Sequence, residues 1–265
     1  MLPVNIQVKF AKSILSVNKA AVNLAVHGEL GMYPISIQAL KSAVEYWLHV
    51  INSDNNILRD AYKSNLQLSD SFVSKIKILL NKLNFSHVWT NQSTFSKRRL
   101  VLAVCKKLDE NYLNFWRSSI FDDSNSNHGN KLRTYRNLKD KYAVNTYLKL
   151  DIDKNIIKIF TKIKISNSKL AIEQGRFHKT PVENRIRPLC KVDVEDEYHF
   201  TMICPKLDNY SVTLINELSD IVSSFKHLNN EAKLKKIFTC EEYDIVKTIV
   251  MKISEMYNIR FALIK

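Results

Sequence analysis

Apolar residues recur every three or four positions along most of the chain, and short polar breaks separate these stretches. Such spacing is typical of amphipathic α-helices. It predicts helices over residues 6–25, 35–52, 57–65, 71–83, 93–120, 131–140, 154–164, 208–225, 229–238 and 240–261. With only 4 Gly and 5 Pro, the chain has few turn signals. We therefore expect a mainly α fold, a bundle-like array of helices with a small irregular or hairpin element in the second half.

One polar stretch, SNSNHGN, lies near the middle of the chain and predicts a linker over residues 122–130. The linker would separate a helical region, residues 1–121, from a basic helical domain, residues 131–265. The first helical pattern begins without a convincing N-cap, which suggests a fragment of a longer protein.

The charge balance changes this picture, because 40 Lys and Arg against 26 Asp and Glu give a net charge of +14 at pH 7. Such an excess favours a polyanionic partner, and RNA or single-stranded DNA is the first candidate. A lysine-rich solvated surface is the alternative. Four scattered Cys, no signal-peptide pattern and no long apolar run favour a cytoplasmic or nuclear protein that does not enter a membrane.

Basic residues gather in the second half. The spacing of Lys154, Lys158 and Lys162 places them along one helix face, which we take to extend to Lys164. The predicted nucleic-acid-binding residues are Lys131, Arg133, Arg136, Lys139, Lys158, Lys162, Arg176 and Lys179. They would act through phosphate and carry little sequence information. Three nearby aromatic residues could stack on bases, although a core role is favoured for the last two: Phe177, Tyr198 and Phe200.

A Cys/His pattern occupies residues 185–205. Cys190, His199 and Cys204 have the spacing C-x8-H-x4-C, which can gather thiolate and imidazole ligands around one zinc ion. A structural zinc site has four ligands, and Arg187 stands where a C-x-x-C pair would place the fourth. This degenerate knuckle disfavours bound zinc, so we expect no cofactor and the two thiols to pack as small hydrophobic groups.

Two further predictions concern neighbours of this site. The acidic run at residues 195–197 is expected to supply surface partners, one holding the His199 imidazole and others pairing with Arg185 or Arg187. Thr239 and Glu242 form a predicted capping box, which would make Cys240 the start of the last helix rather than a fourth ligand.

The motifs IEQGRF, RIRPLC, VEDEYHF and ICP follow one another between residues 172 and 205. In this order they resemble the Cys/His segment after the polymerase domain of LINE-type non-LTR retrotransposon reverse transcriptases. Residues 9–37, VWTNQ at residues 88–92 and residues 134–150 are similar to neighbouring parts of that region. The resemblance implies a post-polymerase region that binds element RNA or target DNA. Arg187 departs from the family pattern, in which a cysteine is usual.

The sequence gives little support for catalysis, because it has no phosphate loop, serine elbow or metal-protease motif. Polymerases of the resembled family hold magnesium with an aromatic-x-Asp-Asp motif, but Ile120 precedes Phe121-Asp122-Asp123 here. We therefore expect a non-enzymatic, nucleic-acid-binding C-terminal fragment of such a reverse transcriptase. The alternative is a helical protein-interaction domain, domesticated or decaying, with no nucleic-acid role.

Overall fold

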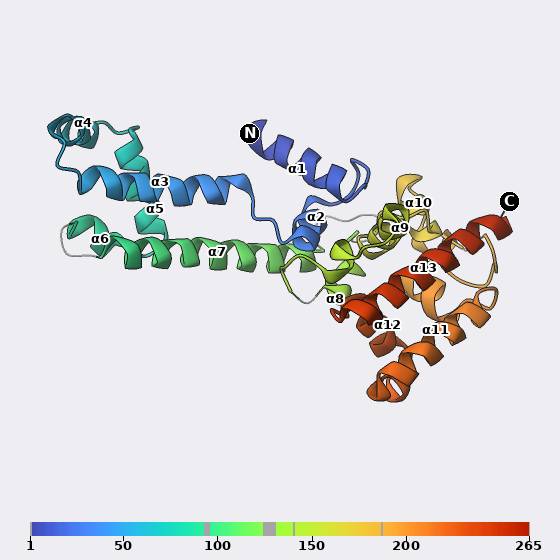
Figure 1. The fold of residues 1–265 in the computed structure, drawn as a ribbon. Coiled ribbons are helices and arrows are strands. Elements are labelled where there is room, and N and C mark those ends of the chain that lie inside the picture. Colours follow the sequence, from blue (N-terminus) through green and yellow to red (C-terminus); the bar gives the residue numbers. More distant parts are fainter. Residues whose placement is uncertain (1, 93–95, 124–130, 140, 187, 265) are drawn as a thin grey trace. The chain divides into compact units, whose positions relative to one another are not determined.

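The computed structural model describes residues 2–92, 96–123, 131–139, 141–186 and 188–264. The prediction of a mainly α fold with a small hairpin-like Cys/His knuckle in the second half is confirmed (Figure 1). Among these residues, extended pairing is limited to two isolated antiparallel bridges, Leu30 with Val144 and Ile186 with Val194.

The chain forms two compact units. The first contains residues Met1–Val4 and Tyr33–Trp116, and the second contains Asn5–Met32 and Arg117–Lys265. This division differs from the predicted one in two ways. Residues 5–32 pack with the second unit, and the boundary falls inside a helix rather than in the predicted linker, of which residues 124–130 lie outside the described residues.

The first unit has a core in which Trp47 is fully buried and stacks on Trp89 with ring centroids 5.8 Å apart. Two of its helices start at polar side chains that accept backbone N–H groups: Asn55 caps one, and Ser71 caps the next. Each such cap contributes about 1 kcal/mol. The unit's elements are α3 (Ile35–Ile51), α4 (Asn56–Leu66), α5 (Phe72–Lys82), α6 (Ser86–Thr90) and most of α7 (Lys97–Phe121).

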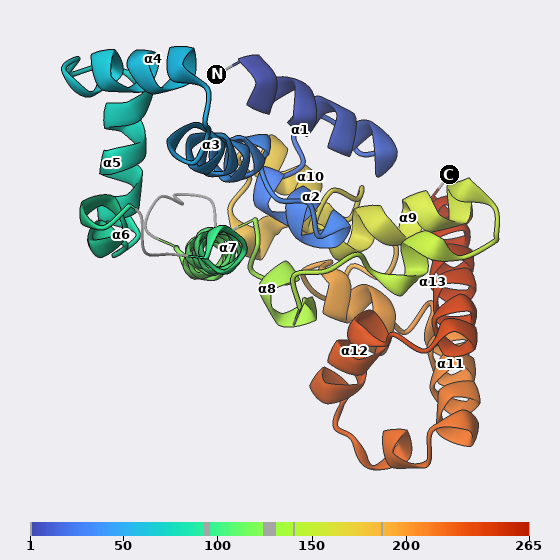
Figure 2. The ribbon, with the colours of Figure 1, turned by 60° about the vertical axis from the view of Figure 1, so that its left-hand side comes forward.

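The second unit begins with most of α1 (Leu2–Ile14), then α2 (Asn23–Leu30) and, after residue 116, α8 (Tyr135–Leu138), η1 (Thr146–Lys149), α9 (Lys154–Lys164), α10 (Ala171–Phe177) and η2 (Val182–Asn184). It continues with the π-helical turn η3 (His199–Ile203), then α11 (Asp208–Ile221), η4 (Ser223–His227), α12 (Asn230–Thr239) and α13 (Tyr243–Ile264). The long helix α13 packs against α9 and α11 (Figures 1 and 2). The core of the second unit includes the side chains of Phe160, Phe200 and Ile253, which are at most 2% exposed.

Five predicted helices differ from the observed ones. The helix expected over residues 208–225 ends at Ile221, because Val222 is extended and residues 223–227 form the separate turn η4. The helix expected over residues 93–120 begins at Lys97. The helix expected over residues 6–25 is two helices, because Ser16 takes the left-handed conformation, with φ of 52°, and the Val17 N–H donates back to the Lys12 carbonyl. The Asn18 carboxamide then accepts the Ala20 N–H in the turn before α2. The helix expected over residues 131–140 is only the short α8, in a segment where packing of buried Leu132, Tyr135 and Leu138 overrides helix propensity. The last helix begins at Tyr243, three residues later than predicted.

Gly31 ends α2 in the left-handed conformation, with φ of 56°. A Cβ atom there would lie 2.8 Å from the Val144 backbone nitrogen. Glycine is therefore required for both the turn and the close approach that forms the Leu30–Val144 bridge.

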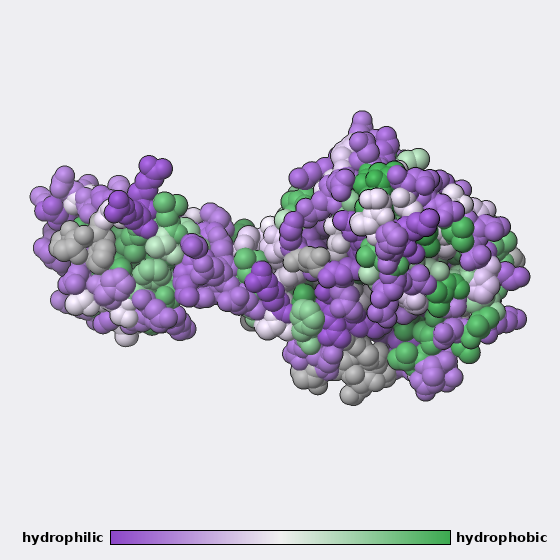
Figure 3. All heavy atoms as spheres, turned by 90° about the horizontal axis from the view of Figure 1, so that it is seen from below, coloured by the Kyte–Doolittle hydropathy of each residue, from purple (hydrophilic) through white to green (hydrophobic). Residues whose placement is uncertain are grey.

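The surface is largely polar. Figure 3 shows hydrophilic side chains over most of the visible face, with apolar residues in separate patches. Within the described part of the chain, no helix combines the length and apolar character that crossing a bilayer requires.

Candidate metal centre and nucleic-acid interface

Cys190 lies in a turn that reverses the chain in the second unit. The antiparallel bridge between Ile186 and Val194 closes this turn, and Lys191 adopts a left-handed conformation with φ of 57°. A left-handed residue directly after the first thiol lets the backbone fold back and brings Cys190 over the following segment. Arg187, the position of the missing fourth ligand, lies outside the described residues.

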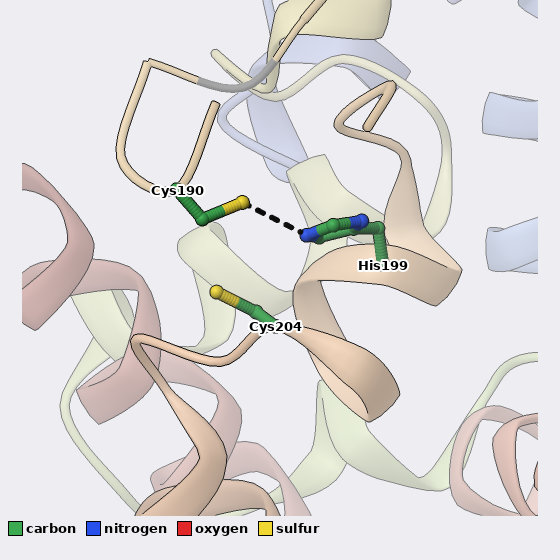
Figure 4. A group of neighbouring side chains, drawn as sticks. All are labelled: Cys190, His199 and Cys204. Atoms are coloured by element: carbon green, nitrogen blue, oxygen red, sulfur yellow. Dashed lines mark hydrogen bonds between the residues drawn. The ribbon is translucent and has the colours of Figure 1, made fainter. Parts of the chain in front are cut away.

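The other two side chains come from η3. His199 is its first residue, and Cys204 follows its last residue. The Asp196 carboxylate accepts the backbone N–H of His199 at 2.8 Å and so fixes the start of the turn. His199 is 3% exposed and Cys204 is fully buried, whereas Cys190 is half-buried. The three side chains therefore meet at the inner side of the knuckle (Figure 4).

The geometry of this Cys/His group fits three corners of a metal tetrahedron. The Sγ atoms of Cys190 and Cys204 and a ring nitrogen of His199 all lie within 4.8 Å of one another. Cys190 Sγ and His199 Nε2 are 3.3 Å apart. Ligand atoms of tetrahedral zinc lie about 3.5–3.8 Å apart, given bond lengths of about 2.0–2.3 Å. A modest rotation of the side chains would therefore admit an ion, and the group supplies three of the four ligands that a structural site uses.

Cys240 does not belong to this group. It follows the last residue of α12 rather than starting the last helix, and its thiol is half-buried in the connection to α13. The predicted capping box is therefore wrong, since the last helix begins at Tyr243. Among the described residues, Cys240 is not one of the side chains that could share a metal with Cys190.

The acidic run near the Cys/His group has a different role from the predicted one. Glu195 and Glu197 are not surface residues, since both are fully buried. Glu195 receives two hydrogen bonds from the Arg260 guanidinium and one from the Ala171 N–H, so it joins α13 to the start of α10. Glu197 pairs with Arg133 at 3.2 Å. These carboxylates hold the knuckle segment to its neighbouring helices.

Three predicted phosphate contacts are already paired with carboxylates. The Arg133 guanidinium contacts Glu197, as above. Arg136 makes a bidentate contact with Asp123 at 3.2 and 3.3 Å, and Arg176 Nη1 donates to both oxygens of Glu173 at 2.6 and 2.7 Å. Paired guanidiniums keep part of their donor capacity but lose much of their net field at the surface.

Lys139 is buried, at 6% exposure, and does not reach the surface. Its ammonium donates to the Ala143 carbonyl at 2.8 Å and lies 3.9 Å from Glu29. Burial, partly offset by Glu29, lowers the pKa of Lys139 from 10.5 to about 8. Lys164 is also buried and lies 3.7 Å from Glu29, so this lysine is not part of the solvated face predicted for α9.

Replacing Lys139 with methionine is expected to stabilise the fold by about 1–3 kcal/mol at pH 7, because the charged form is the disfavoured one. The folded pKa lies below the unfolded one, so the unfolded chain binds more protons between pH 8 and 10.5. The free energy of unfolding of the parent should therefore rise with pH through that window, and the variant should lack this rise. Urea unfolding of the parent and the variant across pH 7–10 measures the stabilisation at pH 7 and the rise with pH.

Lys141→Met provides the control for this prediction. Lys141 is exposed and pairs with Glu241 at the surface, so its loss should cost less than about 1 kcal/mol. Marked destabilisation by Lys139→Met would show that the contacts with Ala143 and Glu29 outweigh the cost of burial.

Lys158, Lys162 and Lys179 remain accessible. Lys158 and Lys162 are half-buried on α9, which Asp153 caps, and Lys179 is exposed after α10. Partial burial lowers the pKa of Lys162, with a further contribution from Lys158. The two lysines on α9 are one helical turn apart and so present two positive charges on one face.

Lys131 and Arg176, which are far apart in sequence, line one hollow in the second unit. This α10 hollow has a volume of about 420 Å³. Its lining includes Asn18, Lys131, Asn167, Glu173, Arg176 and Phe177. Lys131 donates to the Ala20 carbonyl at 2.5 Å, and burial lowers its pKa. The participation of Asn18 could not be inferred from local sequence, because it depends on a contact with Asn167 across 149 positions.

The aromatic residues divide as predicted between core and surface. Phe200 is fully buried and Tyr198 is partly buried against the core, so neither offers an open face for stacking. Phe177 is 82% exposed at the α10 hollow and packs edge-on against His178, with ring centroids 5.1 Å apart.

Comparisons of the chain with protein-family models, with curated proteins and with solved structures gave no match.

Proposed function

We propose that the chain is a non-catalytic, nucleic-acid-binding region that corresponds to the part of a LINE-type reverse transcriptase following its polymerase domain. The observation that carries the proposal is the α10 hollow, where Lys131, Arg176 and exposed Phe177 meet in a chain of net charge +14. Cationic groups beside an exposed aromatic ring suit a single strand, which presents both phosphate and base faces.

The accessible lysines extend this interface in the proposal. Lys158, Lys162 and Lys179 would contact phosphates and release counterions, which gives an affinity that depends on salt more than on sequence. Arg133, Arg136 and Arg176 would act chiefly in the fold, through Glu197, Asp123 and Glu173, respectively. The knuckle would position α10 through the contact of Glu195 with the Ala171 N–H.

A charge-neutralising triple variant tests the proposal. Lys158→Gln, Lys162→Gln and Lys179→Gln together are expected to weaken binding of single-stranded RNA and to lower the log–log salt slope by up to roughly 2, at about 0.7 for each lost contact. Fluorescence anisotropy with labelled octamers of different sequence, at several salt concentrations, provides the measurement.

The control carries the same charge change in the first unit, at three exposed lysines of α4 and α5: Lys63, Lys75 and Lys82. Their replacement by glutamine should leave the slope nearly unchanged. Binding of the parent that does not depend on salt, or equal losses in the two triple variants, would contradict the proposal.

A second function, docking of a protein partner, is favoured by one specific feature of α1. Ile6, Phe10 and Ile14 follow one another at helical spacing and are 65%, 62% and 49% exposed, respectively. A stripe of this kind is typical of a helix that packs against another surface. RNA binding that survives replacement of this stripe by polar residues would separate the two functions.

A further inference from the structure

The α10 hollow is a formed site rather than a flat basic patch. Its volume of about 420 Å³ lies within the roughly 300–1,000 Å³ of small-molecule pockets. Its lining contains buried polar side chains, among them Asn167 at 9% and Glu173 at 8% exposure. Asn167 is held in place by two hydrogen bonds with Asn18, at 2.9 and 3.2 Å. The lining is therefore preorganised by contacts that exist without a ligand.

The charges in the hollow favour an anion. Glu173 is the acidic residue of the lining, and Arg176 neutralises it, with Nη1 donating to both carboxylate oxygens at 2.6 and 2.7 Å. Lys131 adds a further positive charge, and its lowered pKa reports an ammonium that has lost part of its hydration. An anion placed beside Lys131 would restore the lost stabilisation of that ammonium.

Phe177 specifies the rest of the ligand. A phenyl ring that is 82% exposed beside a cationic pocket offers an apolar face to a planar group attached to the anion. A nucleotide has this combination of one phosphate and one stacking base, and every base can stack on such a ring.

We propose that the α10 hollow binds one nucleotide unit of a single strand, with its phosphate at Lys131 and its base against Phe177. This inference deepens and rests on the proposed nucleic-acid-binding function. It gives the proposed interface a position where a base, and not only the backbone, is held.

Two substitutions separate the base contact from the phosphate contact. Phe177→Ala is expected to weaken binding of an oligouridine octamer roughly 5- to 150-fold, as stacking on one aromatic ring predicts, without changing the salt slope. Lys131→Gln is expected to lower that slope by roughly 0.7. Phe177→Trp should retain the affinity, and circular dichroism melts verify that each variant is folded.

Matched controls come from the same unit. Phe10 is 62% exposed on α1, and Lys226 is exposed in η4, and neither lines the hollow. Phe10→Ala and Lys226→Gln should change octamer affinity less than twofold. Equal effects of Phe177→Ala and Phe10→Ala would overturn the assignment of the hollow, whereas salt-dependent binding by the parent would leave the proposed function standing.

Mononucleotides test the hollow independently of strand binding. Ligand-observed NMR with the full chain should detect binding of uridine monophosphate, and weaker binding of uridine or of inorganic phosphate. The double variant Phe177→Ala, Lys131→Gln should bind none of the three. Binding of uridine monophosphate without octamer binding would retain the hollow and refute the proposed function. Equal binding of uridine monophosphate by the parent and this double variant would refute the hollow.

Discussion

Replacing Arg187 with cysteine is expected to give a protein that binds one zinc ion per chain and unfolds at a higher temperature with zinc than without it. The substitution would complete C-x2-C-x8-H-x4-C, adding a thiolate to Cys190, His199 and Cys204, whose ligand atoms already lie within 4.8 Å of one another. Zinc binding by four such ligands is worth roughly 10–16 kcal/mol in zinc-finger peptides at neutral pH and acts as folding free energy.

The parent chain should show neither effect, because a guanidinium in place of the fourth thiolate removes a ligand and adds a positive charge near a dication. Arg187→Ser is the matched control, since it removes the charge without supplying a thiolate. Elemental analysis after dialysis and thermal melts with and without chelator measure both properties. Stoichiometric zinc in the parent would contradict this account, as would an Arg187→Cys protein that binds none.

Replacing Glu195 with leucine is expected to destabilise the second unit by roughly 3–5 kcal/mol, because it leaves the Arg260 guanidinium buried without its carboxylate. Glu195 is fully buried and Arg260 is 3% exposed, and their bidentate contact joins the knuckle to α13. The same substitution removes the acceptor of the Ala171 N–H at the start of α10. Urea unfolding at pH 7 gives the change in free energy.

Two further variants define the origin of this loss. The double variant Glu195→Leu, Arg260→Met should recover most of the stability, since apolar replacement of a whole buried ion pair is often neutral or better. Glu217→Leu, which removes the partly exposed partner of Lys252 on α11, should cost less than about 1 kcal/mol. A Glu195→Leu protein no less stable than Glu217→Leu would refute the structural role of the buried pair.

The spacing of apolar residues was sufficient to predict the helices that have a continuous apolar stripe. The pattern through Val44 and Trp47 predicted α3 almost to its ends, and the spacing of Phe160 and Ile163 predicted α9. It failed at residues 15–22, where apolar spacing continues but the helix does not. Ser16 takes a left-handed conformation that serine rarely adopts, and Asn18 pairs with Asn167, a partner 149 positions away that the local sequence does not indicate.

The positions of the candidate site residues could be predicted only in part. Spacing alone brought Cys190, His199 and Cys204 together correctly, because the three ligands lie within a short segment. The charged residues were harder to place. Lys164 follows Phe160 by one helical turn, and this period puts it on the buried side of α9, where Glu29 from α2 stabilises it. Sequence identifies a cation, but burial and partners decide whether it can meet a phosphate.

Photocrosslinking tests the central claim most directly. An oligouridine octamer carrying one 4-thiouridine would be irradiated with the full chain, and the adducts located by peptide mass spectrometry. We expect the main adduct on the peptides covering residues 170–179, which contain Phe177, with a yield that excess unlabelled strand and high salt both reduce. Adducts confined to residues 33–116 of the first unit, or adducts that excess strand does not reduce, would contradict single-strand binding by the second unit.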